Sequence, residues 1–425
     1  MTASRPVGLE ALFTPAFAQP AGSPIRELFP YLGRPGMISF AGGYPSPSLF
    51  DVAGLQQAAA QALGDAAAAL QYGPTEGQPL LREALLELCT QRGLAARPAE
   101  LLVTTGSQQA FDLLVRVLVQ PGDTVLVEAP AYPAALQALR LAGARIAELP
   151  MDGDGLRTDT LAERLAQWAT EGRRPKLLYT VPSFSNPRGS LLPLERRRQL
   201  VALAQAYGFL VIEDDPYGEL RFSDEVLPTL HRLGHDAFGA DHPVVYLSSL
   251  SKTVAPALRV GWMLAPEALV RRCAIAKQTV DLCTSPLAQL VAAHYLRSGR
   301  YPATVAAART EYRARALAMA DALSARLGDR LQWQRPAGGM FLWLQATAAV
   351  DAQRLFAAAV AQGVLFVPGA AFFQSPPADL ALRLSFAAPD LAQIQEGVAR
   401  LARAFELAAS AEPLPGPTAV TAPAA

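Results

Sequence analysis

The sequence predicts an α/β protein with a large α/β/α domain, built on a mostly parallel sheet, and a smaller α+β domain. Its 425 residues are enough for two or three packed units. From residue 101 onward, short β-rich runs alternate with longer helical patterns, which is typical of a parallel sheet covered by helices. Near residue 300 this alternation stops and a long charged helical pattern begins, which favours a second unit.

The predicted strands of the large domain share one property, because each ends in polar, Gly or Pro residues. They span residues 101–104, 124–128, 176–181, 209–213, 244–247 and 260–264. Helical patterns cover residues 52–70 and 110–119. Open α/β sheets bind ligands outside the carboxyl ends of their strands. The polar strand ends therefore predict one site.

The chain divides into four segments. Residues 1–50, rich in Pro and Gly, form an arm with a short helical pattern near residues 25–32, and residues 51–300 form the large domain. Residues 301–410 form the small domain, and residues 411–425 a Pro- and Ala-rich tail that we expect to be disordered. The small domain's predicted elements are helices at 304–327 and 390–407 and strands at 340–344, 364–367 and 382–385.

Composition excludes several functions. The 37 basic and 37 acidic side chains cancel, so no global field draws the chain to nucleic acid or to an anionic membrane. No apolar run approaches the roughly 20 residues of a spanning helix, and residues 1–19 lack the pattern of a signal peptide. The three cysteines and four histidines show no metal-ligand spacing, and the cysteines are expected to be buried thiols. These features predict a cytoplasmic enzyme without a metal.

Two Ser-containing turns follow predicted strands. Thr105–Gln109 opens an amphipathic helix, so its amides and hydroxyl suit an anion, although such a turn also serves as a plain helix cap. The second turn, Ser248–Thr253, contains Lys252, and Arg259 follows seven residues after that lysine. Taken alone, this turn would fit a solvated loop. Its apolar flanking strands instead place Lys252 at the end of a buried strand.

Two further motifs end neighbouring strands. Glu213-Asp214-Asp215-Pro216-Tyr217 puts adjacent carboxylates and a phenol at a buried strand end. Such carboxylates repel one another unless a cation lies opposite, and a protonated ring nitrogen would serve. Asn186, in the turn 182–189, offers an amide that could bind a phenolic oxygen.

Together with Arg383, these motifs resemble the class I/II, fold-type I pyridoxal-phosphate aminotransferases. The chain is most similar to their bacterial α-aminoadipate and kynurenine aminotransferase branch, and it also resembles the C-terminal domain of MocR-type regulators. The resemblance covers residues 25–407. It implies pyridoxal 5′-phosphate (PLP) as the cofactor, held by the large domain, with the arm contributing to the small domain and the active site. It also implies a homodimer with shared active sites.

The resemblance assigns cofactor roles to individual residues. It implies that Lys252 holds PLP covalently and moves the substrate proton, and that Asp214 pairs with the pyridinium nitrogen. Asn186 and Tyr217 would bind the ring's 3′ oxygen, and Tyr132 would stack on the ring. The residues implied for the phosphate are Ser107, Gln108, Ser249, Ser251 and Arg259.

For the substrate, the resemblance implies that Arg383 binds the α-carboxylate, although an Arg in an apolar strand could instead form an internal salt bridge. Gly43 would permit close approach of the substrate carboxylate, which Asn186 also faces. Tyr72 would reach into the neighbouring subunit's site, touching cofactor and substrate. Arg26 would engage an acidic side chain, whereas Tyr44 stands where the family usually has Leu.

The predicted activity is transfer of an amino group from an α-amino acid (aminoadipate, aromatic or large apolar) to a 2-oxo acid such as 2-oxoglutarate, by a ping-pong mechanism. Two alternatives stay open. Another PLP enzyme that labilises the Cα–H bond, a β-elimination lyase or a decarboxylase, shares the first step. A regulator's effector-sensing domain shares the motifs, but such proteins carry a winged-helix domain where only a short arm precedes the matched region here.

Overall fold

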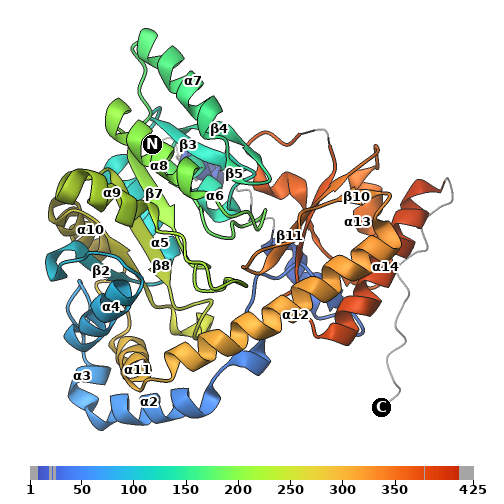
Figure 1. The fold of residues 1–425 in the computed structure, drawn as a ribbon. Helices are drawn as coiled ribbons and strands as arrows, with labels where there is room; N and C mark the ends of the chain where they lie inside the picture. Colours follow the sequence, from blue (N-terminus) through green and yellow to red (C-terminus); the bar gives the residue numbers. More distant parts are fainter. Residues whose placement is uncertain (1–7, 19–21, 23–24, 378, 411–425) are drawn as a thin grey trace, which may run out of the picture.

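A computed structural model describes residues 8–18, 22, 25–377 and 379–410. The predicted tail at 411–425 and parts of the predicted arm lie outside these residues. Within them, an eight-stranded sheet and a four-stranded sheet form two halves, and the long helix α12 (Tyr301–Leu327) runs from one half to the other (Figure 1).

The large sheet has the strand order β2-β9-β8-β7-β6-β3-β4-β5. Its strands are β2 (Leu101–Thr104), β3 (Thr124–Ala129), β4 (Arg145–Asp152), β5 (Gly155–Leu156), β6 (Leu177–Thr180), β7 (Leu210–Asp214), β8 (Val244–Ser249) and β9 (Gly261–Leu264). Five of these strands run parallel to one another: β3, β4, β6, β7 and β8. Strand β9 runs antiparallel to both of its neighbours, β2 and β8. The sequence prediction missed β4 and β5, because β4 is a partly exposed strand that carries Pro150 and several charges.

Helices cover both faces of this sheet. Alternate strand residues explain why: Val125 and Val127 pack into one hydrophobic cluster, whereas Leu126 packs into another. The first cluster includes α5 (Ser107–Leu118), α6 (Pro133–Leu141) and α10 (Glu267–Val280), and the second includes α7 (Thr158–Thr170), α8 (Leu194–Tyr207) and α9 (Leu230–Phe238). The predicted layered α/β architecture is therefore present.

The helix predicted at 52–70 is wrong as a single element. It breaks at Asp65 into α2 (Val52–Gly64) and α3 (Ala66–Leu70). The Asp65 carboxylate accepts a hydrogen bond from the Ala68 amide at 3.1 Å and so begins a new helix. An Asp that bonds nearby backbone competes with helix continuation. With α4 (Pro79–Gln91) and α11 (Pro286–Arg297), these helices cover the β2 and β9 end of the sheet.

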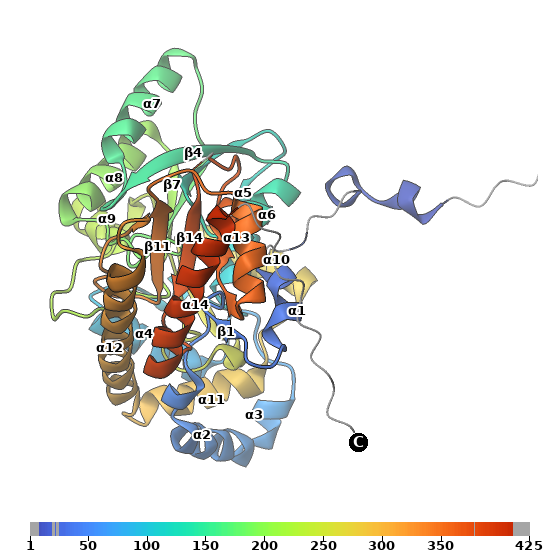
Figure 2. The ribbon, with the colours of Figure 1, turned by 90° about the vertical axis from the view of Figure 1, so that its right-hand side faces the viewer.

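The small sheet is antiparallel, with the order β10-β11-β14-β13. Its strands are β10 (Leu331–Gln332), β11 (Phe341–Ala346), β14 (Ala381–Ser385) and β13 (Val367–Pro368). Figure 2 shows α12, α14 (Leu391–Ala409) and α13 (Ala352–Ala361) covering β11 and β14. The arm contains α1 (Phe29–Leu32) and, shortly after it, β1 (Ile38–Ser39). It joins this half because β1 pairs with β12 (Val364–Leu365).

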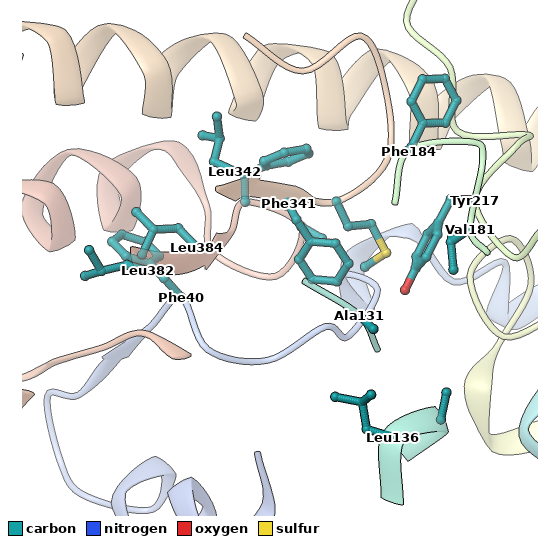
Figure 3. Close-up of a cluster of buried hydrophobic side chains, with 14 of the residues drawn as sticks. Phe40, Ala131, Leu136, Val181, Phe184, Tyr217, Phe341, Leu342, Leu382 and Leu384 are labelled. Atoms are coloured by element: carbon teal, nitrogen blue, oxygen red, sulfur yellow. The ribbon is translucent and has the colours of Figure 1, made fainter. Parts of the chain in front are cut away.

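A hydrophobic cluster joins the two halves where the large sheet's strands end (Figure 3). Phe341 of β11 meets Tyr217 edge to face, with ring centroids 5.8 Å apart. Phe184 and Val181, from the segment after β6, belong to the same cluster. This contact places the small sheet over the carboxyl ends of the parallel strands, where the sequence predicted a site.

Two smaller observations complete the fold. Cys89 and Cys273 are buried thiols as predicted, whereas Cys283 is partly exposed. Among the described residues, no helix has both the length and the apolar character needed to cross a membrane.

Gly261, at the start of β9, is pressed against the start of α5. A Cβ on Gly261 would lie 2.5 Å from the Gly106 carbonyl carbon and 2.6 Å from the Ser107 nitrogen. We therefore expect Gly261→Ala to lower the free energy of unfolding by about 1–3 kcal/mol, the usual effect of overpacking. Urea unfolding measures this, with Gly64→Ala, which adds a Cβ in open space, as the control. Equal unfolding midpoints for the two variants would contradict the clash.

Candidate active site

A cavity of about 300 Å³ lies at the edge of the large sheet where β6, β7 and β8 end. All the sequence-predicted site residues except Arg26 and Tyr72 line it: Gly43, Ser107, Gln108, Tyr132, Asn186, Asp214, Tyr217, Ser249, Ser251, Lys252, Arg259 and Arg383. Arg259 belongs to this edge because it lies two residues before β9, which runs antiparallel to β8 and so begins beside the carboxyl end of β8.

Lys252 follows β8 and enters the cavity. Its Nζ donates a hydrogen bond to the Gly43 carbonyl oxygen at 2.9 Å. Burial, together with the nearby charges of Arg383 and Arg259, lowers the pKa of Lys252 to about 8. The amine is therefore partly neutral near physiological pH, which a nucleophile or a base requires.

Asp214 ends β7 and is buried, with 7% of its surface exposed. Its Oδ2 accepts a hydrogen bond from the Tyr179 hydroxyl at 2.8 Å, while Oδ1 has no hydrogen-bond partner among the described residues. Burial raises the pKa of Asp214 to about 6. A buried carboxylate oxygen without a partner is costly. A cationic donor in the cavity would satisfy it.

One end of the cavity is shaped for an anion, and we call it the anion cup. Its residues are Gly106, Ser107, Gln108, Ser249, Ser251 and Arg259. Gly106 has a φ of 79° and caps the amino end of α5, where free amides favour negative charge. The Ser249 and Ser251 hydroxyls lie 2.8 Å apart, and Arg259 donates to the Thr105 carbonyl at 3.1 Å. The cup thus combines amides, hydroxyls and one guanidinium.

Arg383 lies in the middle of β14 and is only 1% exposed. It donates to Asn186 Oδ1 at 2.8 Å and to the Ala41 carbonyl, and its guanidinium carbon lies 4.4 Å from the centre of the Phe341 ring. Its Nε has no partner among the described residues, nor does Arg383 form an ion pair with any of them. The alternative of an internal salt bridge is therefore wrong. Burial lowers the pKa of Arg383 to about 10, and a carboxylate ligand would compensate the buried charge.

Two predicted residues lie outside the cavity. Arg26 is exposed in the turn η3 (Arg26–Leu28), but its charge reaches Tyr44, which lines the cavity. Tyr72 follows α3 and is 79% exposed, so it does not line the cavity of its own chain. Among the described residues, no group of His, Cys, Asp and Glu is arranged to hold a metal ion.

Residues 41–401 match the family described as Aminotransferase class I and II. The chain belongs to this family. It is 42% identical to the 2-aminoadipate transaminase of Thermus thermophilus, covering 92% of this chain and 96% of that protein. It is 38% identical to aromatic-amino-acid aminotransferase 1 of Thermococcus litoralis, covering 90% and 91%.

The solved structures show the same relation for this aminotransferase-family chain. The kynurenine aminotransferase of Pyrococcus horikoshii, solved in complex with PMP, has a TM-score of 0.88 and 36% identity over 93% of this chain and 97% of that one. The fold is thus the fold-type I aminotransferase fold, as predicted. Relatives also include HTH-type transcriptional regulators such as TauR of Rhodobacter capsulatus, 36% identical over 86% of this chain and 73% of that protein.

Two of the residues that line the cavity and that sequence reasoning missed are Tyr179 and Phe341. Tyr179 lies within a predicted strand, but nothing in the apolar run around it indicates that its hydroxyl binds Asp214. Phe341 is the platform under Arg383, and it comes from a strand of the other sheet. The Tyr179–Asp214 contact depends on the pairing of β6 with β7, and the place of Phe341 in the cavity depends on how the two halves pack. Neither can be read from the local sequence pattern.

The lowered pKa of Lys252 predicts unusual reactivity. In protein freed of small molecules, we expect acylation of Lys252 to accelerate about tenfold per pH unit below about 8 and then to level off, since only the neutral amine reacts. Peptide mapping after brief exposure to acetic anhydride measures the rate, and Lys176, whose side chain is 46% exposed, is the internal control. A Lys252 rate that still rises steeply at about pH 10 would contradict the lowered pKa.

Proposed function

We propose that the chain is a PLP-dependent aminotransferase that moves an amino group from an α-amino acid to a 2-oxo acid by a ping-pong mechanism. The observation that carries the proposal is the partnerless Oδ1 of buried Asp214, in a cavity that also holds Lys252 and the anion cup. A ring with a protonated nitrogen, an aldehyde and a phosphate would engage all three features at once. The family's chemistry agrees with this donor set.

The residues present fit this cofactor. Asp214 Oδ1 would accept from the ring nitrogen, and the anion cup would hold the phosphate. Arg383 occupies the Asn186 Oδ1, so the Asn186 amide nitrogen remains to donate to the ring's 3′ oxygen together with Tyr217. Tyr132, which lines the cavity, would stack on the ring. When bound, PLP supplies an electron sink for the substrate's Cα.

The chain's own groups supply the remaining steps. Arg383 binds the substrate α-carboxylate with its guanidinium, close to the backbone of Gly43. Lys252 would hold the cofactor covalently at rest, and it would be a free amine once the amino acid has taken its place. Its lowered pKa would let this amine take the proton from Cα and deliver it at C4′ of the cofactor. The first substrate would leave as its 2-oxo acid with uptake of water, and the second 2-oxo acid would take up the amino group by the reverse proton movements.

A half-reaction experiment tests the proposal. After reconstitution with PLP, an amino acid alone should convert the absorbance of the lysine-bound cofactor to that of the amine form, and 2-oxoglutarate should restore it. Lys252→Ala cannot bind the cofactor through a lysine, and in this variant formation of the amine form should be slower by about 10³-fold, the typical contribution of a positioned acid–base group. Release of ammonia or carbon dioxide without a 2-oxo acid acceptor would instead indicate a β-elimination lyase or a decarboxylase.

For the substrate, we propose broad use of aminoadipate, aromatic and large apolar amino acids. Curated relatives include a 2-aminoadipate transaminase and an aromatic-amino-acid aminotransferase. Arg26 supports the acidic substrates, because its charge acts on Tyr44, which lines the cavity.

Arg26→Ala should therefore lower kcat/KM for 2-aminoadipate roughly tenfold, the effect of losing one charge-assisted hydrogen bond. Activity on phenylalanine should change little, because its side chain offers Arg26 no carboxylate. Steady-state kinetics with both amino acids measures this, and Arg34→Ala removes a neighbouring charge as the control. Parallel losses for both substrates would count against recognition by Arg26.

We also propose a homodimer in which Tyr72 completes the partner's site. The exposure of Leu70 (67%) and Tyr72 (79%) supports a covering partner, because large side chains that project from one turn are favoured at interfaces.

Tyr72→Phe removes one hydroxyl and should weaken PLP retention roughly tenfold, while the dimer stays intact. Cofactor loss during dialysis gives the retention, and analytical ultracentrifugation gives the assembly state. Normal retention in a dimeric variant would show that this hydroxyl does not reach the cofactor.

A further inference from the structure

The chain contains only three lysines, and one of them is fully buried behind the anion cup. Lys277, near the end of α10, has a side-chain exposure of 0%. Removing an ammonium group from water is costly unless hydrogen bonds compensate it. Nothing in the proposed mechanism uses this lysine, so its contacts require another explanation.

Lys277 is bound by acceptors from three other residues. Its Nζ lies 2.7 and 2.8 Å from the two carboxylate oxygens of Asp281, which caps the end of the same helix. It also donates to Gln109 Oε1 and to the Thr284 hydroxyl, each at 3.1 Å. The ammonium therefore joins the end of α10 to the first turn of α5.

All three of these partners in turn contact Thr105, the residue immediately before the anion cup, and the Thr105 and Thr284 hydroxyls lie 3.1 Å apart. The Thr105 amide donates to Gln109 Oε1 at 2.8 Å, and its hydroxyl donates to Asp281 Oδ2 at 3.0 Å. Gln109 Nε2 also donates to Asp281 Oδ2, at 2.7 Å. The Thr105 carbonyl accepts from Arg259 at 3.1 Å. Every polar group of Thr105 is thus bound, and Lys277 binds each residue that holds the Thr105 amide and hydroxyl.

Stability alone does not account for this network. Replacing a buried ion pair with apolar groups of similar volume is often neutral or stabilising, because desolvation offsets the attraction. Asp281 is 26% exposed at its side chain, so water could solvate it without Lys277. What Lys277 adds is a fixed direction for Gln109 and Asp281. These two residues fix the position of Thr105 and, through it, the position of the free amides of the anion cup.

We propose that Lys277 is a positioning residue for the anion cup and that, through Gln109, Asp281 and Thr105, it sets how tightly the cup grips a phosphate group. The proposal rests on the proposed PLP function. It assigns Lys277 no contact with the cofactor. The expected signature is a loss of affinity that depends on the ligand's phosphate.

Titration with PLP and with pyridoxal, which lacks the phosphate, tests this assignment. Absorbance of the lysine-bound cofactor gives the dissociation constant of each ligand for the parent chain, Lys277→Met and Arg271→Met. The last variant removes an exposed charge from the same helix. Lys277→Met should weaken PLP about tenfold, as expected for losing one charge-assisted hydrogen bond. It should leave pyridoxal within about twofold, and Arg271→Met should change neither affinity.

The other outcomes overturn the assignment. Equal weakening of PLP and pyridoxal would mean that Lys277 only supports the fold, and unchanged affinities would mean that the network does not act on the cup. Asp281→Asn, which keeps the shape but not the charge, should give the same phosphate-dependent loss and decides the question if Lys277→Met does not fold. If the parent chain itself binds no PLP, the proposed function fails, and the role of Lys277 fails with it.

Discussion

Three cationic side chains, Lys252, Arg259 and Arg383, share one cavity in which Asp214 is the only carboxylate among the described lining residues. The chain as a whole has no net charge, so this local excess of positive charge comes from the fold and not from composition. Each cation makes the electrostatic free energy of the cavity more favourable when an anion is bound and less favourable when none is bound. Repulsion from the two arginines also helps to lower the pKa of Lys252 to about 8. Anion binding and amine reactivity are therefore two results of one charge arrangement.

That arrangement depends on the contact between the two sheets. Arg383 belongs to the small sheet, and it reaches the large half only because Phe341 packs against Tyr217 at the strand ends. Its hydrogen bond to Asn186 crosses the same boundary. The hydrophobic cluster in Figure 3 thus determines the geometry of the polar groups, because its packing fixes the distance between Arg383 and the charged groups of the large half.

Much of the fold could be predicted from local patterns, because buried parallel strands read as short apolar runs with polar ends. Residues such as Asp214 and Lys252 were found for that reason. The pattern failed where a side chain overrode it, as at Asp65, which ends one helix and begins another. It failed too at β4, whose mixed polar sequence does not look like a strand. Contacts between distant segments, such as Tyr179 with Asp214 or Lys277 with Gln109, have no local signature at all.

The side-chain amide of Asn186 binds Arg383, and it is also the group proposed to bind the ring oxygen of the cofactor. Arg383 binds the Asn186 oxygen, and in the proposed complex the Asn186 amide nitrogen would donate to the ring oxygen in the same cavity. In the proposed complex, a carboxylate at Arg383 would share the guanidinium with Asn186 and so would change the polarity of the amide that meets the ring oxygen. Substrate binding would then alter the absorbance of the cofactor before any bond breaks.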